Sequence, residues 1–159
     1  MNTAYIAKIV VLAAATLVAA CTTPQPKKAA EPPTMSYNQK LSSDSLFAFG
    51  KASLADLSDA GRTQLDALAT GLNGRPYGMV HVIGHSDRIG NAKANVDLST
   101  RRADAVRDYL VQKGVPSEKI TAVGRGSVEP VVECDDKDRA ALIACLAPNR
   151  RVEIKIVSQ

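Results

Sequence analysis

The stretch GHSDRIG, residues 84–90, decides how this 159-residue chain is arranged. The apolar run VHVI, residues 80–83, comes just before it and has the alternation of a strand, so the glycines predict a turn that leaves Asp87 just beyond the strand end. A helix is expected to begin near Ser99, with Arg102 in its first turn. The sequence therefore predicts a carboxylate and a guanidinium at one rim, beside the anion-attracting start of a helix.

Further elements are expected on both sides of this stretch. Strands are predicted at residues 46–49, 77–84, 120–123 and 152–156, and helices at residues 58–73 and 99–113, the second closed by Gly114. The last strand alternates cleanly, which predicts one buried face and one wet face. Two helices interleaved among four strands predict an α/β (α+β) two-layer sandwich.

The first 43 residues are typical of an exported, tethered protein. Residues 1–20 hold Lys8 and then an apolar run too short to span a bilayer comfortably, which predicts a signal peptide. Residues 18–21, VAAC, resemble a bacterial lipobox, so Cys21 is expected to become the acylated first residue; an ordinary secretory signal with a chance cysteine is the alternative. The segment 21–43 contains four prolines and a Lys-Lys pair, which predicts a linker before a domain at 44–159.

Two further cysteines remain, Cys134 and Cys145, and such a pair in an exported protein is most simply a disulfide. Closing a loop of that size contributes on the order of 3 kcal/mol through the unfolded state. A metal site formed with the neighbouring aspartates is the alternative, but no Cys-x-x-Cys spacing supports it.

The composition argues against two classes of function. The net charge is +4, but basic and acidic residues are interspersed and aromatic residues make up only 4%, so little is available to stack on bases and no nucleic-acid partner is expected. His81 and His85 with Asp87 suggest a hydrolytic or metal site, but no nucleophile, second carboxylate or metal motif completes it. We therefore predict no enzyme activity and no metal.

Three sequence blocks together resemble the OmpA-like peptidoglycan-binding domain. They are GHSD at 84–87, the pattern N-x-x-L-S-x-x-R-A at 95–103, and NRRVEI at 149–154. The resemblance implies an OmpA C-terminal-like domain with a mixed four-stranded sheet in the order 1-4-2-3, packed against two main helices. Gly50 and Ala94 depart from the family pattern, which often has Asp and Tyr at these positions.

The resemblance also implies a ligand, the meso-diaminopimelate of the peptidoglycan stem peptide. Asp87 would accept its ammonium, and Arg102 would hold its carboxylate through two parallel hydrogen bonds. An ordinary ion pair between Asp87 and Arg102 is the alternative. The other positions that the resemblance brings to the pocket are Asn95 and the backbone of Leu98, with His85 and Ser86 shaping the turn and Arg151, or Arg150 beside it, as a weaker rim residue.

The whole architecture is similar to that of peptidoglycan-associated lipoproteins. It implies an outer-membrane lipoprotein that anchors the membrane non-covalently to peptidoglycan, with its domain facing the periplasm. The partners expected are peptidoglycan, the outer membrane through the lipid on Cys21, and other envelope proteins; no cofactor is expected apart from that lipid. An envelope lipoprotein that binds other proteins, with weak or no cell-wall binding, is the alternative function.

Overall fold

The computed structural model describes residues 37–48 and 50–157. The predicted signal peptide, Cys21 and the linker as far as residue 36 lie outside these residues. No helix in the described part is long and apolar enough to cross a bilayer. The elements in chain order are β1 (Tyr37–Ser42), α1 (Ser43–Leu46), the 3-10 turn η1 (Leu54–Asp56), α2 (Asp59–Asn73), β2 (Val80–Gly84), α3 (Ala92–Gln112), η2 (Ser117–Lys119), β3 (Ile120–Gly124), α4 (Arg139–Cys145), η3 (Ala147–Asn149) and β4 (Arg151–Ile156).

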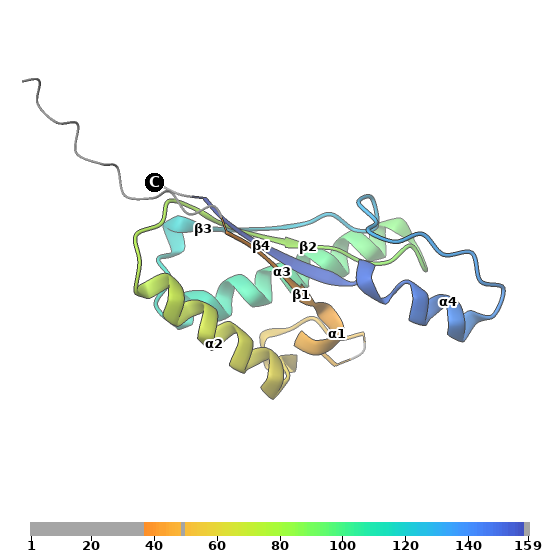
Figure 1. Cartoon of the computed structure of the whole chain (residues 1–159), viewed down its shortest axis with the longest axis horizontal. Coiled ribbons are helices and arrows are strands. Elements are labelled where there is room, and N and C mark those ends of the chain that lie inside the picture. Colours follow the sequence, from red (N-terminus) through yellow and green to blue (C-terminus); the bar gives the residue numbers. More distant parts are fainter. Residues whose placement is uncertain (1–36, 49, 158–159) are drawn as a thin grey trace, which may run out of the picture. The chain divides into compact units, whose positions relative to one another are not determined.

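The four strands form one mixed sheet in the order β1-β4-β2-β3. β4 runs antiparallel to both β1 and β2, whereas β2 and β3 are parallel and are joined through α3. The helices α2 and α3 lie on one side of this sheet, and α4 lies near the end where β4 begins (Figure 1). The predicted α/β two-layer sandwich and its strand order are therefore confirmed.

The core lies between the sheet and the two long helices. Val80 and Val82 of β2 and Val152 and Ile154 of β4 are fully buried on the helix side. Both helices bury the faces that their apolar periodicity predicted, because residues three or four apart lie on one side of a helix. These buried helix residues are Leu65, Leu68, Ala69 and Leu72 of α2 and Ala103, Val106 and Leu110 of α3.

The first strand was predicted at the wrong place. It is β1, within the segment assigned to the linker, and not residues 46–49. Leu46 ends α1, and Phe47 makes only an isolated bridge to Leu57, although both Leu46 and Phe47 are buried in the core. β1 has no apolar alternation because it is an edge strand that buries only Leu41, and it is held mainly by backbone pairing with β4.

Two helix predictions also need correction. α3 begins at Ala92, not near Ser99, because the side chain of Asn91 caps it by accepting hydrogen bonds from the backbone N–H groups of Lys93 and Ala94. α4 was not predicted; it has seven residues, and those after Arg139 are apolar without interruption, so they lack the alternation of apolar and polar faces that marks a helix.

The alternation in β4 predicted that its outer face would be exposed to solvent. The structure shows otherwise for the first half of the strand. Arg151 and Glu153 both lie on that face and are buried, because the Arg151 Nε donates a hydrogen bond of 2.8 Å to the Glu153 carboxylate. The loop that follows β3 also reaches this face, where the carbonyl of Glu129 accepts from the Arg151 guanidinium at 3.3 Å. A charged pair with its own partners can thus occupy alternate positions that would otherwise be solvated.

The predicted disulfide is confirmed. Cys134 and Cys145 are bonded to each other, with their Cα atoms 6.1 Å apart. Since each sulfur is occupied by the other, the alternative of a thiolate metal site is not adopted.

α3 lies very close to the end of β2, and a glycine makes this possible. A Cβ built on Gly84 would collide with the backbone carbonyl oxygen of Ser99 in α3, and helix backbone cannot easily move away. The missing side chain at Gly84 therefore sets the distance between β2 and α3.

We expect Gly84→Ala to destabilise the domain by ~1–3 kcal/mol, because backbone must move to admit the methyl group. Urea unfolding followed by circular dichroism measures this change. Gly71→Ala in α2 is the matched control, since nothing lies within 4 Å of a Cβ there. The control should be neutral or slightly stabilising, as expected for Gly→Ala inside a helix. Equal effects of the two substitutions would contradict the packing argument.

Candidate functional site

Asp87 lies in the loop that follows β2, residues 85–90, which we call the Asp87 loop. The residue is 9% exposed. One carboxylate oxygen accepts a 2.9 Å hydrogen bond from the backbone N–H of Ile89, which folds the loop back on itself. The other oxygen accepts from the Arg150 guanidinium, also at 2.9 Å. The predicted position of Asp87 beyond the strand end is thus correct, but its partner within the protein is Arg150.

Asn95 and Ser86 hold the Asp87 loop in place. The side-chain amide of Asn95 donates to the backbone carbonyls of Asp87 and Ile89 at 3.1 and 3.3 Å. The Ser86 hydroxyl donates to the Asp87 carbonyl at 3.0 Å, and the Ser86 backbone N–H donates to Gly126. Both side chains are buried, so their contacts fix the backbone of Asp87 from the protein interior.

Arg102 lies within α3 and is only 3% exposed. Its Nε donates to the backbone carbonyl of Lys51 at 3.0 Å, and its guanidinium carbon lies 5.8 Å from the centroid of the Phe47 ring. Among the described residues its two terminal amino groups have no hydrogen-bond partner, and no carboxylate forms an ion pair with it. Buried polar side-chain atoms that are sealed and unpartnered are confined, in the described part, to Ser43 and His85, so the Arg102 amino groups remain accessible.

The charges around Arg102 oppose one another. Burial lowers the pKa of Arg102, and the nearby Arg150 guanidinium lowers it further, whereas the carboxylates of Asp44 and Asp87 raise it. A buried guanidinium with a free donor edge carries a desolvation cost that an incoming anion can offset. The ordinary Asp87–Arg102 ion pair, considered as an alternative, is not among the ion pairs of the described residues.

Arg150 links three parts of the chain. Its Nε and one amino group hold the Asp44 carboxylate of α1, with the closest contact at 2.7 Å. The other amino group donates to Asp87 and to the backbone carbonyl of Ile143 in α4, the latter at 3.0 Å. Hydrogen bonding to Asp44 first, and to Asp87, raises the pKa of Arg150. Arg150 therefore neutralises Asp87 while being held by a second carboxylate.

Of the two arginines predicted as weaker rim residues, the structure places Arg150 and not Arg151 beside Asp87. Arg151 pairs with Glu153 on the outer face of the sheet, away from Asp87, whereas Arg150 occupies the rim. Arg151 is the first residue of β4 and takes the outward direction that strand alternation gives it, whereas Arg150 lies just before the strand, at the end of η3. The sequence pair Arg150-Arg151 indicated that an arginine lies near Asp87, but it did not show which of the two.

The helix-start donors predicted near Ser99 are also absent from the site. Because α3 begins at Ala92, Leu98 lies inside the helix, where backbone N–H groups are engaged in the hydrogen-bond ladder. Ser99 instead supports the neighbouring turn: its hydroxyl accepts a 2.9 Å hydrogen bond from the Gly126 backbone. The charged groups gathered near Asp87 are thus side chains, with no helix start among them.

His85 does not reach the rim. It is 1% exposed, and neither ring nitrogen has a hydrogen-bond partner; the nearest carboxylate oxygen, from Glu129, lies 4.0 Å from Nδ1. Burial lowers the pKa of His85, and the Arg151 guanidinium lowers it further. With Asp87 engaged by Ile89 and Arg150, the His85–Asp87 dyad weighed from the sequence does not form.

Comparisons with known proteins agree with the fold described above. The model of the OmpA family matches residues 46–143. The chain belongs to the OmpA family. It is 51% identical over 119 residues to outer membrane protein A of Yersinia pseudotuberculosis, an alignment that covers 73% of this chain and 33% of that protein. Outer membrane protein A of Escherichia coli O157:H7 is 49% identical over 119 residues, with 73% and 34% covered. The chain thus spans about a third of the length of these curated relatives.

Solved structures of OmpA-like domains resemble the fold. The peptidoglycan-associated lipoprotein of Burkholderia pseudomallei is 28% identical with a TM-score of 0.59, and the alignment covers 76% of this chain and 90% of that one. The cell wall anchor of the type VI secretion system (T6SS) of Pseudomonas aeruginosa is 29% identical with a TM-score of 0.63, covering 79% and 88%.

The buried His85 should make the stability of this OmpA-family domain depend on pH. Its pKa is lower in the folded state than in the unfolded chain, so the unfolded state binds the proton more readily. The contribution of His85 is therefore complete above its unfolded pKa, ~6.5, and is lost as the pH falls below that value. Urea unfolding at about pH 7.5 and about pH 5 should show this loss.

His85→Leu should reduce the difference in free energy of unfolding between the two pH values, because no ring remains to be protonated. His81→Gln is the control: His81 is less buried and its ring bonds Thr121 at 2.8 Å. An unchanged pH dependence in His85→Leu would show that other groups cause it.

Proposed function

We propose that this domain binds peptidoglycan without making or breaking covalent bonds, by gripping the side chain of meso-diaminopimelate. The observation that carries the proposal is the free donor edge of the buried Arg102, on which the carboxylate of Asp87 acts electrostatically. The ligand side chain ends in an ammonium and a carboxylate on one carbon, so it presents the reverse arrangement of charges.

Arg102 would take the carboxylate of the ligand. A guanidinium offers parallel donors that match the two oxygens of a carboxylate, and charge-assisted bonds of this kind are among the strong ones. Nothing within the described residues has to be displaced from these donors, because only the Nε of Arg102 is already engaged. The Phe47 ring and the Lys51 carbonyl would keep the side chain in place while it binds.

Asp87 would take the ammonium of the ligand. One amino group of Arg150 now occupies that oxygen, so the ammonium would share or replace this contact. Arg150 would not be left unpaired, since Asp44 holds it through two other nitrogens. The exchange therefore replaces one cation by another on Asp87 and leaves no buried charge without a partner.

The relatives support the same class of ligand. One similar solved structure is named a peptidoglycan-associated lipoprotein and another a cell wall anchor. Membership of the OmpA family agrees with the expectation that the domain is not an enzyme. We further propose that acylation of Cys21 attaches the chain to the outer membrane, with the linker carrying the domain into the periplasm toward the cell wall.

The second candidate is an envelope lipoprotein that binds other proteins and has lost cell-wall binding. The two proposals differ in what they require of Arg102. A protein that had lost this ligand would have no reason to keep a buried guanidinium without a carboxylate partner, because leaving a charge unpaired lowers stability. We therefore favour peptidoglycan.

The full-length protein in mild detergent should sediment with purified sacculi that contain diaminopimelate. Asp87→Ala and Arg102→Ala should each lower the affinity by at least about tenfold, equivalent to ~1.4 kcal/mol. Arg102→Lys should also bind weakly, since it keeps the charge but loses the paired donors. Arg101→Ala is the matched control, because it removes an exposed guanidinium from the adjacent position of α3.

Circular dichroism of each variant shows whether the fold is intact. Equal sedimentation of the wild type and all variants would contradict the site. Failure of the folded wild type to sediment would contradict peptidoglycan binding and favour the protein-binding alternative.

Sacculi that contain lysine in place of diaminopimelate give an independent prediction. Lysine retains the ammonium but lacks the terminal carboxylate, so Arg102 would have nothing to bind. We expect such sacculi to retain the protein poorly. The residual binding should be insensitive to Arg102→Lys, because that substitution acts on the missing contact. Equal binding to both kinds of sacculi would show that Arg102 does not read the carboxylate.

A further inference from the structure

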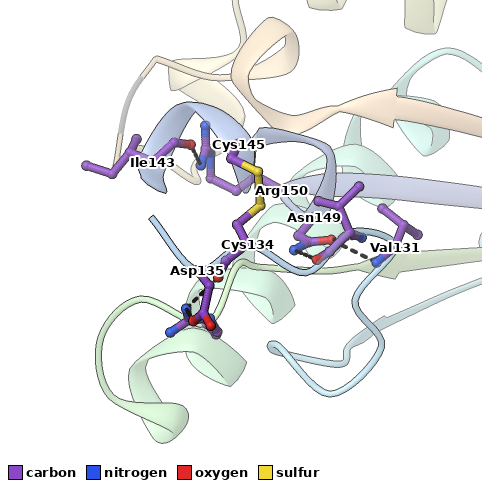
Figure 2. Close-up of a disulfide and its surroundings, with 9 residues drawn as sticks. Val131, Cys134, Asp135, Ile143, Cys145, Asn149 and Arg150 are labelled. Carbon is purple, nitrogen blue, oxygen red and sulfur yellow. Dashed lines mark hydrogen bonds and ion pairs between the residues drawn. A yellow bond between two sulfur atoms is a disulfide. The ribbon is translucent and has the colours of Figure 1, made fainter. Parts of the chain in front are cut away.

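The segment closed by the disulfide, residues 134–145, touches both arginines that flank Asp87. We call it the disulfide loop. The backbone carbonyl of Cys134 accepts a 2.8 Å hydrogen bond from the Arg88 guanidinium. The backbone carbonyl of Ile143 accepts one of 3.0 Å from Arg150, through the same amino group that holds Asp87. Figure 2 shows the Arg150 guanidinium directed at Ile143, with the disulfide beside it.

Few other contacts among the described residues hold the disulfide loop to the domain; one is an exposed ion pair of 4.0 Å between Asp135 and Arg88. Its helix α4 has seven residues and buries none of them, and so short a helix is not stable in isolation. Apart from Cys134, which is buried, the residues of the loop are exposed or half-buried. The loop also contributes nothing to the hydrophobic core formed by the sheet, α2 and α3. The chain is anchored just outside the loop, by the hydrogen bonds between Asn149 and Val132 on one side and by the buried Leu146 on the other. Within the loop, the disulfide is the covalent constraint on where the two carbonyl groups lie.

We infer that the disulfide loop positions the Asp87 site and that reduction of the Cys134–Cys145 bond weakens binding of the diaminopimelate ligand. The inference rests on the function proposed above. With the bond open, the loop gains conformational freedom, and the carbonyls of Cys134 and Ile143 no longer stay at Arg88 and Arg150. Both arginines then move more freely beside Asp87, and the site must be ordered when the ligand arrives, which costs affinity.

The chemistry needed is thiol–disulfide exchange with a dithiol, such as the active-site pair of a thiol–disulfide oxidoreductase in the envelope. A thiolate of the partner attacks the sulfur of Cys145, which is the exposed cysteine of the two. A mixed disulfide with Cys145 forms, and Cys134 leaves as a thiolate. The second thiol of the partner then resolves the mixed disulfide. Two electrons and two protons pass to the protein, which ends with two thiols, and the partner ends with a disulfide.

No residue of the core cluster lies in the disulfide loop, so reduction should lower the free energy of unfolding but leave the domain folded, and the effect on binding can be measured on folded protein. The residues that make up the core belong to β1, β2, β3, β4, α1, α2, α3 and the segments between them, and none lies in the disulfide loop. A merely structural role would lower the fraction of folded protein. A positioning role lowers the affinity of protein that remains folded.

The test compares sedimentation of the oxidised full-length protein with sacculi before and after treatment with dithiothreitol. We expect reduction to weaken binding on the order of fivefold, within the range seen for coupled neighbouring groups. The double variant Cys134→Ser/Cys145→Ser should bind like the reduced protein and should not respond to dithiothreitol. Far-UV circular dichroism should be nearly unchanged in all three samples.

A double-mutant cycle shows whether the effect passes through the arginines. In Arg88→Ala, one of the two contacts is already absent, so opening the disulfide should cost less affinity than in the wild type. Arg139→Ala is the matched control: it removes an exposed arginine from the disulfide loop itself, and the full effect of reduction should remain.

Each outcome decides between the proposals. If the oxidised protein sediments and the reduced protein sediments equally well, the positioning role is wrong while peptidoglycan binding stands. If binding falls only in samples that have also lost their circular dichroism signal, the disulfide is structural and the inference is wrong. If the oxidised, folded protein does not sediment at all, the proposed function fails first.

Discussion

The close approach of α3 to the ends of β2 and β3 is the constraint on which the site depends. Gly84 and Gly124 both face the first half of α3, and a Cβ on either would collide with Ser99 or Thr100. Because these glycines have no side chains, the helix lies directly on the strands, and Arg102 is brought beside the loop that leaves β2. A wider spacing would separate the two charges that the site needs together. The arrangement of the charges therefore depends on the backbone packing of α3 against β2 and β3.

The two arginines of the site, Arg150 and Arg102, differ in how many of their donors have a partner. Arg150 is saturated: it has two carboxylates and a backbone carbonyl around it. Arg102 is more deeply buried but uses only its Nε. A domain selected for stability alone would gain by giving Arg102 a carboxylate or replacing it with an apolar residue. An unpaired buried donor is better explained as the part of a binding site whose partner arrives from outside, since such a group is already desolvated and fixed when the ligand enters.

The outline of the fold could be predicted from the sequence, and so could the place of Asp87 beyond β2, because both depend on strong local patterns. Arg102 was indicated by the resemblance, and it lies further along α3 than the first turn where it was predicted. The faces of α2 and α3 follow from the spacing of Leu and Val residues, and the place of Asp87 follows from a strand that ends in glycine. β1 could not be found in this way, since an edge strand that buries one residue has no periodic signal. The start of α3 was missed because its first turns have no apolar face and depend on the single cap, Asn91. The choice between Arg150 and Arg151 depends on one residue of register, which only the pairing of β4 determines.

Arg102 has free donors, whereas every guanidinium nitrogen of Arg150 has a partner, and this difference affects which ligands the site would accept. A simple anion could approach Arg102, but it would be repelled by the carboxylates of Asp44 and Asp87, whose charges act on Arg102 as well. A simple cation would have to compete with Arg150 for Asp87 and would gain nothing at Arg102. A small molecule that carries both charges avoids each penalty, because its carboxylate uses the free donors while its ammonium takes the place of a guanidinium that Asp44 continues to hold. Discrimination would then come from the cost that the site imposes on ligands with only one charge, as much as from its contacts with the correct one.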